Sequence, residues 1–248
     1  MMTKRIESID ILRGLVIVIM TLDHTREFFF MAIPLSDPMN LETTSASVFI
    51  SRWLAHFCAP IFVFLAGISA YLYGVNVTKK QLTLFLLKRG CFLILLELTI
   101  VNFAWGFSLT PSMIYLQVIW VIGLSMIALA GIIWFPKFIV VAMILFLIIG
   151  HHLMLGISFN DEIGKIIWSV LYQRSVIPIT EGLSARTSYP LLPWIGIIAL
   201  GYLYGSIFNK EYKPEKRKII LLASSFVFII AFLILRFSTV SYTHLRAH

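Results

Sequence analysis

The chain has 248 residues, of which 59% are hydrophobic and only 13% are charged, whereas soluble domains carry about 25% charged residues. This composition, with a mean hydropathy of +0.92, excludes an ordinary soluble domain and predicts an integral membrane protein. The formal net charge is +8, but basic residues beside apolar spans are expected from membrane topology alone, so we expect no nucleic-acid partner.

Seven apolar runs are long enough to cross a bilayer as helices, which takes about 20 residues each. We therefore predict an all-α, polytopic transmembrane helix bundle of about seven spans, in an inner or plasma membrane. The predicted spans are residues 9–31, 51–73, 82–105, 114–134, 138–155, 191–208 and 219–237.

The basic residues predict the orientation of these spans. Most of the 20 Lys and Arg residues fall on the side of the N-terminus, and an excess of such residues is typical of cytoplasmic loops. The N-terminus is therefore predicted to be cytoplasmic, and the long connection 156–190 exterior. Its stretch IGKIIWSVLYQRSV predicts either an interfacial helix or a lid over a site.

The first span carries ionisable side chains at both ends, Arg13 at one and Asp23, His24, Arg26 and Glu27 at the other. Such groups within a span are costly and are candidates for a functional site. On a helix, Arg13 and His24 fall within about 20° of one face and about 16 Å apart along the axis. The spacing lets Asp23 pair with Arg26, and lets Glu27 orient His24 as a general base. The alternative interpretation is a solvated helix end.

The second and third spans add polar groups. Arg52 and His56 lie one turn apart near the predicted exterior end, where they predict an anion-tolerant, substrate-binding pocket; a structural histidine bonded to a carbonyl is the alternative. Glu97 lies well inside the third span and requires a partner. We expect a structural ion pair with Arg52 or Arg26.

On the cytoplasmic side, Arg13, Lys88 and Arg89 are candidates for binding phosphate groups, and Gly14 allows a ligand to approach the backbone closely. The alternative for Lys88 and Arg89 is ordinary positive-inside flanking.

No metal site is predicted from the sequence. Cys58 and Cys91 lack metal-ligand spacing, and both fit the pattern of small apolar residues within spans. His151 and His152 are adjacent, so they point about 100° apart on a helix and do not share a metal.

Five strings resemble, in order, bacterial members of the heparan-α-glucosaminide N-acetyltransferase catalytic-domain family, within the wider transmembrane acyltransferase superfamily. They are RIESIDILRGLVIVIMTLDHTREFF, RWLAHFCAPIFVFLAGISAYL, LELTIVNFAWG, LQVIWVIGLSMIALAG and YPLLPWIGIIALGYLYG. The resemblance covers residues 5–205 and implies an acyltransferase. Its implied reaction moves an acetyl group from cytoplasmic acetyl-CoA to an amine or hydroxyl of an exterior-facing sugar or glycan.

The resemblance places the superfamily histidine on His24 and the superfamily Arg-Gly pair on Arg13 and Gly14. It implies that Arg13 lies near the nucleotide phosphates of acetyl-CoA, the co-substrate, and that His24 is the base in direct transfer. The candidate catalytic residues are His24, Asp23, Arg26 and Glu27; the candidate acetyl-CoA-binding residues are Arg13, Gly14 and Arg89; the candidate substrate-binding residues are Arg52 and His56.

Residues 1–238 are predicted to form one transmembrane acyltransferase-like domain. Residues 239–248 end in SYTHLRAH and are interpreted as a read-through tail on a truncated protein. Expected partners are the sugar or glycan acceptor, membrane lipid and a second copy in a homodimer. The competing hypotheses are a transporter or proton-coupled carrier that uses Asp23, His24, Arg26 and Glu97, and a purely structural membrane protein.

Overall fold

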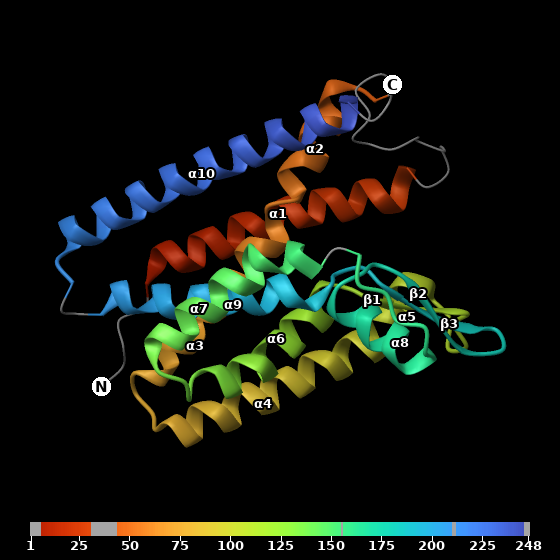
Figure 1. Cartoon of the computed structure of the whole chain (residues 1–248), viewed down its shortest axis with the longest axis horizontal. Coiled ribbons are helices and arrows are strands. Elements are labelled where there is room, and N and C mark those ends of the chain that lie inside the picture. Colours follow the sequence, from red (N-terminus) through yellow and green to blue (C-terminus); the bar gives the residue numbers. More distant parts are fainter. Residues whose placement is uncertain (1–5, 31–43, 155, 210–211, 246–248) are drawn as a thin grey trace. The chain divides into compact units, whose positions relative to one another are not determined.

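A computed structural model of the chain describes residues 6–30, 44–154, 156–209 and 212–245 (Figure 1). The chain divides into two compact units, Met1–Gly205 and Ser206–His248. The first unit contains the helices and strands that form the site, and the second consists mainly of one long helix.

The described part of the chain is mainly helical, and every predicted span contains a helix. A helix also forms within the connection 156–190, as the IGKIIWSVL pattern predicts. The α-helices are α1 (Glu7–Phe30), α2 (Ala46–Ala55), α3 (Cys58–Gly74), α4 (Lys79–Leu96), α5 (Asn102–Gly106), α6 (Val118–Ile132), α7 (Lys137–Ile148), α8 (Glu162–Leu171), α9 (Leu191–Tyr204) and α10 (Pro214–Leu245). Shorter helical turns are the π-helix η1 (Glu97–Val101) and the 3-10 helices η2 (Gly150–Met154) and η3 (Gly205–Phe208).

Two helical segments of the described chain are long and apolar enough to cross a membrane by length and composition, Ala46–Gly74 and Leu191–Phe208. Val118–Ile132 and Lys137–Ile148 are apolar but shorter. The seven spans and the cytoplasmic N-terminus therefore stay predictions. α1 and α4 both carry several charged residues, which lowers their mean hydropathy.

The core of the first unit forms where α3 packs on α9 and α4 packs on α6. Two glycines bring α3 and α9 close together. A Cβ added at Gly67 would overlap the carbonyl oxygen of Ile198, and one added at Gly201 would overlap the carbonyl oxygen of Phe64. The buried apolar cluster comprises Val63, Ala70, Leu82, Leu86, Met126, Leu129, Ala130, Ile132, Ile133, Val140, Ile144, Ile198 and Ala199.

A small sheet corrects the all-α prediction. Its strands are β1 (Met113–Leu116), β2 (Val176–Thr180) and β3 (Leu183–Thr187), in the order β1-β3-β2. β3 runs parallel to β1 and antiparallel to β2, and the sheet lies at one end of the helices of the first unit (Figure 1). Residues 114–116 were expected to begin a helix, but they pair instead with β3, about 70 residues later in the chain.

The sheet has one buried face and one polar face. In the register, Tyr115 lies beside Arg186, which lies beside Val176. Their neighbours Leu116, Ile177 and Ala185 are buried. Because side chains alternate along a strand, Tyr115 and Arg186 share the opposite face from these apolar residues.

We predict that Gly67→Ala lowers the stability of the protein, because the new methyl group overlaps the backbone of α9. Overpacking of this kind typically costs about 1–3 kcal/mol. Gly131→Ala is the matched control, since a Cβ there meets nothing within 4 Å and alanine is the better helix former by up to about 1 kcal/mol. Thermal unfolding of the solubilised protein measures both. Equal effects of the two substitutions would contradict the close α3–α9 approach.

Candidate functional site

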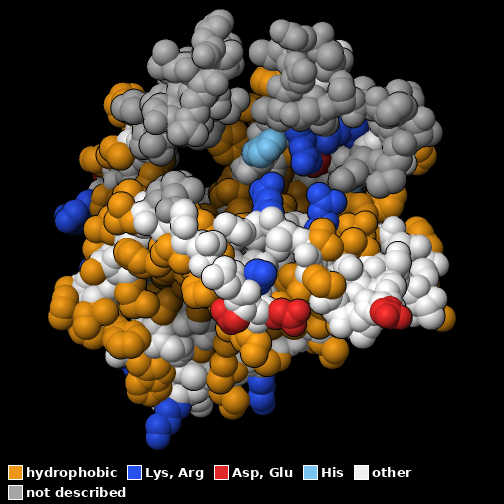
Figure 2. Space-filling view, turned by 45° about the vertical axis from the view of Figure 1, so that its right-hand side comes forward, with side chains coloured by type: hydrophobic (Ala, Val, Ile, Leu, Met, Phe, Trp, Pro, Cys, Tyr) orange, Lys and Arg blue, Asp and Glu red, His pale blue; other side chains and the backbone are white. Residues whose placement is uncertain are grey.

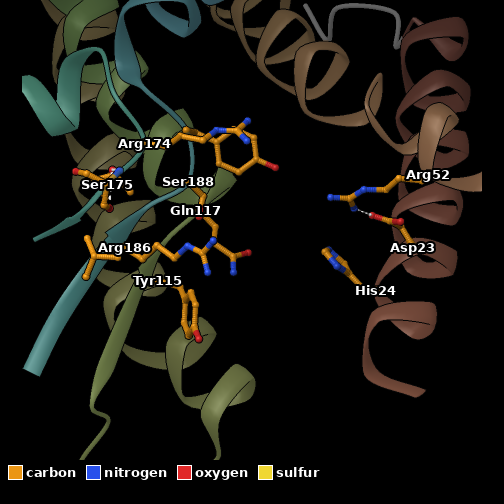
Figure 3. Close-up of a pocket in the computed structure, with 12 residues that line it drawn as sticks. Asp23, His24, Arg52, Tyr115, Gln117, Arg174, Ser175, Arg186 and Ser188 are labelled. Carbon is orange, nitrogen blue, oxygen red and sulfur yellow. Dashed lines mark hydrogen bonds and ion pairs between the residues drawn. The ribbon is translucent and has the colours of Figure 1, made fainter. Parts of the chain in front are cut away.

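A pocket of about 500 Å³ lies between the α1–α2 region and the sheet, within the size range of about 300–1,000 Å³ that is usual for ligand sites. Figure 3 shows side chains from the two sides directed toward one another across the gap. Its lining residues are Asp23, His24, Arg52, Tyr115, Gln117, Arg174, Ser175, Val176, Arg186, Thr187, Ser188 and Tyr189. We call the first three the helix wall and the other nine the sheet wall.

The helix wall is held together by Asp23, which is only 8% exposed. Its Oδ1 accepts from Nη2 of Arg26 at 2.6 Å, and its Oδ2 accepts from Nη1 of Arg52 at 2.7 Å. The first contact confirms the predicted pairing along α1, and the second joins α1 to α2. Ile9, Val16 and Asp23 are all buried. They follow one another at intervals of seven residues, which places them on nearly the same face of α1. Asp23 is therefore buried because it lies on the helix face that packs inward.

His24 lies beside this ion-pair cluster, and its imidazole rests against an indole. The ring centroids of His24 and Trp105 are 5.4 Å apart at 82°, and Phe28 stacks on the same indole at 4.9 Å. Edge-to-face packing of this kind restricts the ring's orientation. The predicted orienting residue, Glu27, has a side chain outside the described residues, so its role stays a prediction.

The sheet wall is formed mainly by the polar face of the sheet and by residues next to the ends of its strands. Tyr115 and Arg186 are register partners, and Gln117 lies two residues beyond Tyr115, where alternation returns it to the same side. Thr187, on the other face, is 3% exposed, and its Oγ1 accepts from the backbone N–H of Ser175 at 2.9 Å. This bond fixes the segment before β2 alongside β3.

Glu97 and Asn102 position the sheet wall from behind. Asn102 is 7% exposed; its Oδ1 accepts from the N–H of Tyr115 at 2.6 Å, and its Nδ2 donates to the carbonyl oxygen of Tyr115 at 3.0 Å. Glu97 is fully buried; its Oε1 accepts from the N–H of Gln117 at 3.1 Å and its Oε2 from the N–H of Trp120 at 3.3 Å. Both polar side chains thus satisfy backbone groups at the junction of β1 and α6.

The contacts of Glu97 correct the expectation of an ion pair with Arg52 or Arg26, because Asp23 holds both of those guanidinium groups. The carboxylate lies instead at the N-terminus of α6, where free N–H groups and the helix dipole favour negative charge. Gln117, the residue preceding α6, makes no side-chain cap of its own. The cap therefore comes from a residue 20 positions earlier.

Apart from Glu27, five candidate residues lie outside the pocket lining, and one of them, Arg26, binds the lining residue Asp23. His56 is exposed, and its Nδ1 lies 2.7 Å from the carbonyl oxygen of Arg52, which is the structural alternative considered for it. Arg13 bonds Asp10 at 3.2 Å and Ser69 at 3.0 Å. The other two are Gly14, over which a Cβ would meet open space, and Arg89, whose guanidinium lies 5.8 Å from the Phe85 ring centroid.

The pocket lining is strongly basic. It contains three arginines, Arg52, Arg174 and Arg186, and one acidic residue, Asp23. Figure 2 shows basic side chains gathered beside a histidine, with apolar side chains on either side. The arrangement therefore favours a ligand that carries negative charge.

The sequence alone did not indicate Tyr115, Gln117, Arg174 or Arg186 as site residues. Arg174 and Arg186 lie in the connection 156–190, which was predicted to be exterior, and Tyr115 lay in a predicted span. One signal in the sequence could have indicated the two arginines as site residues. The positive-inside tendency explains Lys and Arg in cytoplasmic loops, but it does not explain two arginines in a connection predicted to be exterior.

A family model described as Heparan-alpha-glucosaminide N-acetyltransferase, catalytic, matches residues 5–244. The chain belongs to this family. The match confirms the resemblance stated from the five sequence strings, and it identifies the protein as a member of a membrane-associated acetyltransferase family. The comparisons of the chain with curated proteins and with solved structures found no match.

We predict that Glu97→Gln destabilises this family member by about 1–3 kcal/mol, the usual cost of leaving a buried polar group without a partner. An amide has one accepting oxygen, so one of the two N–H groups that Glu97 now satisfies would face an NH₂ donor. Glu181→Gln, at an exposed turn position between β2 and β3, is the control and should stay within about 0.5 kcal/mol of the parent. Thermal and denaturant unfolding measure the difference; an unchanged Glu97→Gln variant would contradict the capping role.

Proposed function

We propose that this chain is a transmembrane acetyltransferase that moves an acetyl group from acetyl-CoA to an amine or hydroxyl of an exterior-facing sugar or glycan. The observation that carries the proposal is a pocket in which His24 adjoins a buried ion-pair cluster, in a chain that matches an N-acetyltransferase family over residues 5–244.

His24 is proposed as the general base. As the acceptor nitrogen or oxygen attacks the thioester carbonyl carbon, His24 takes the proton from the attacking atom. The new C–N or C–O bond forms, the C–S bond breaks, and the CoA thiolate then takes up a proton to leave as free CoA. An imidazole suits this role because its unperturbed pKa lies near neutrality.

Asp23, Arg26 and Arg52 are proposed to support this chemistry by position and charge. The carboxylate of Asp23 holds both guanidinium groups at 2.6 and 2.7 Å, which leaves net positive charge next to His24. Cations placed in this way stabilise the oxyanion that develops on the thioester carbonyl during attack.

The donor is proposed to reach the pocket along α1. The helix is continuous from Glu7 to Phe30, so Arg13 and His24 are about 16 Å apart along its axis. The side chain of Arg13 is 38% exposed, and a Cβ at Gly14 would meet nothing within 4 Å. These features support a binding mode in which the nucleotide of acetyl-CoA lies near Arg13, Gly14 and Arg89. The thioester would then lie near His24.

We predict that His24→Gln lowers acetyl transfer by about 10²–10⁴-fold, the usual contribution of a positioned general base. The assay uses the protein in proteoliposomes with acetyl-CoA and glucosamine, and measures release of free CoA. Thr25→Ala is the control, because Thr25 is the next residue on α1, is exposed and lies outside the pocket lining. It should keep the parent activity.

Two outcomes would contradict the proposed function. Turnover unchanged by His24→Gln, with thermal unfolding confirming that the variant is folded, would remove His24 from the mechanism. Sugar flux across sealed vesicles without any CoA release would instead support the carrier hypothesis.

A further inference from the structure

Two arginines of the sheet wall have no assigned role in the proposed transfer. Arg186 lies in β3, directly beside Val176 of β2 in an antiparallel pair. Residues opposite one another in such a pair point to the same face, and so do residues two apart on a strand. Arg174 lies two residues before Val176, just ahead of β2, and Figure 3 shows the side chains of Arg174 and Arg186 directed across the pocket toward the helix wall.

The segment that carries Arg174 is held by hydrogen bonds to Thr187. Oγ1 of this residue accepts from the N–H of Ser175 at 2.9 Å and lies 3.2 Å from the carbonyl oxygen of Gln173. The N–H of Thr187 also donates to the carbonyl oxygen of Ser175 at 2.9 Å. The backbone on either side of Arg174 is thus held against β3, which limits the ordering cost of a ligand contact made by this side chain.

The charge of these two arginines is not neutralised within the described part of the chain. Asp23, the acidic residue of the lining, forms ion pairs with Arg52 and Arg26. Among the described residues, neither Arg174 nor Arg186 forms an ion pair. Two guanidinium groups on one face of a pocket form a site for an oxyanion, because each presents a planar set of donors that matches phosphate, sulfate or carboxylate.

We propose that Arg174 and Arg186 bind an anionic group of the acceptor, so that the enzyme selects acidic sugars over neutral ones. This inference rests on the proposed function, which identifies the ligand as the acceptor of the acetyl group. An anion held at the sheet wall leaves the rest of the sugar facing His24 across the pocket. Tyr115, Gln117 and Ser188 supply hydroxyl and amide groups on the sheet wall for the sugar hydroxyls.

The acceptor is a better source of the anion than the donor. Both arginines lie in the connection 156–190, opposite α1 in the pocket, whereas the proposed nucleotide position lies at Arg13. That residue is absent from the pocket lining and is about 16 Å from His24 along α1. The phosphates of the donor and the anion of the acceptor are therefore assigned to separate arginines.

The test compares three probes, glucosamine, glucosamine 6-phosphate and glucosamine 6-sulfate, by calorimetric titration of the full chain in nanodiscs. We expect the two anionic sugars to bind at least about tenfold more tightly than glucosamine, the lower end of what a charge-assisted hydrogen bond contributes. Arg174→Gln and Arg186→Gln should each remove about tenfold of this preference, measured within each variant as the ratio of the affinity for the anionic sugar to that for glucosamine. Lys165→Gln is the control, because it removes one charge from exposed α8 outside the pocket lining and should leave all three affinities unchanged.

Equal binding of the three probes, or a preference that survives in both arginine variants, would overturn the proposal. So would a weakened affinity for acetyl-CoA in place of the anionic sugars, because that result would assign the arginines to the donor. CoA release by the same samples tests the proposed transfer separately. Selective binding of anionic sugars without CoA release would contradict the acetyltransferase function and still support the anion site.

Discussion

The fully buried Glu97 carboxylate is the constraint on which the site depends. It accepts the N–H groups of Gln117 and Trp120 at the start of α6, while Asn102 bonds both backbone groups of Tyr115. The side chains of Glu97 and Asn102 are buried, and a backbone donor left unpaired beside them would be costly. One carboxylate and one amide therefore hold the turn from β1 to α6, and with it the polar face of the sheet. The π-helical turn Glu97–Val101 separates the two polar residues, and such turns are frequent at functional sites.

On the opposite side of the pocket, the carboxylate of Asp23 forms ion pairs with two arginines. A carboxylate that binds two guanidinium groups from α1 and α2 leaves one positive charge beside His24. The sheet wall adds the charges of Arg174 and Arg186, so the two sides repel one another until an anion enters. Arg174 and Arg186 are exposed to the pocket, so their charges are available to a ligand.

The sequence predicted one side of the site and not the other, and the difference follows from locality. Asp23, His24 and Arg26 lie within one helical turn, and their pairing depends only on helical spacing. Arg186 reaches the pocket because β3 pairs with β1, about 70 residues earlier. No local pattern encodes that pairing or the choice of face. Glu97 was correctly expected to need a partner, but its partners are backbone N–H groups, which sequence spacing does not reveal.

By itself, the sequence determined the largely helical nature of the chain, the positions of its helices and the family to which it belongs, because apolar periodicity and motif order are properties of the linear chain. Only the tertiary structure decided that a three-stranded sheet faces α1 and that Asp23 also binds Arg52. It likewise placed His56 and Arg13 outside the pocket lining and four other polar residues within it. The physical reason is that strand register and long-range hydrogen bonds depend on which segments meet in space, and helical or alternating periodicity fixes only the faces that each segment offers.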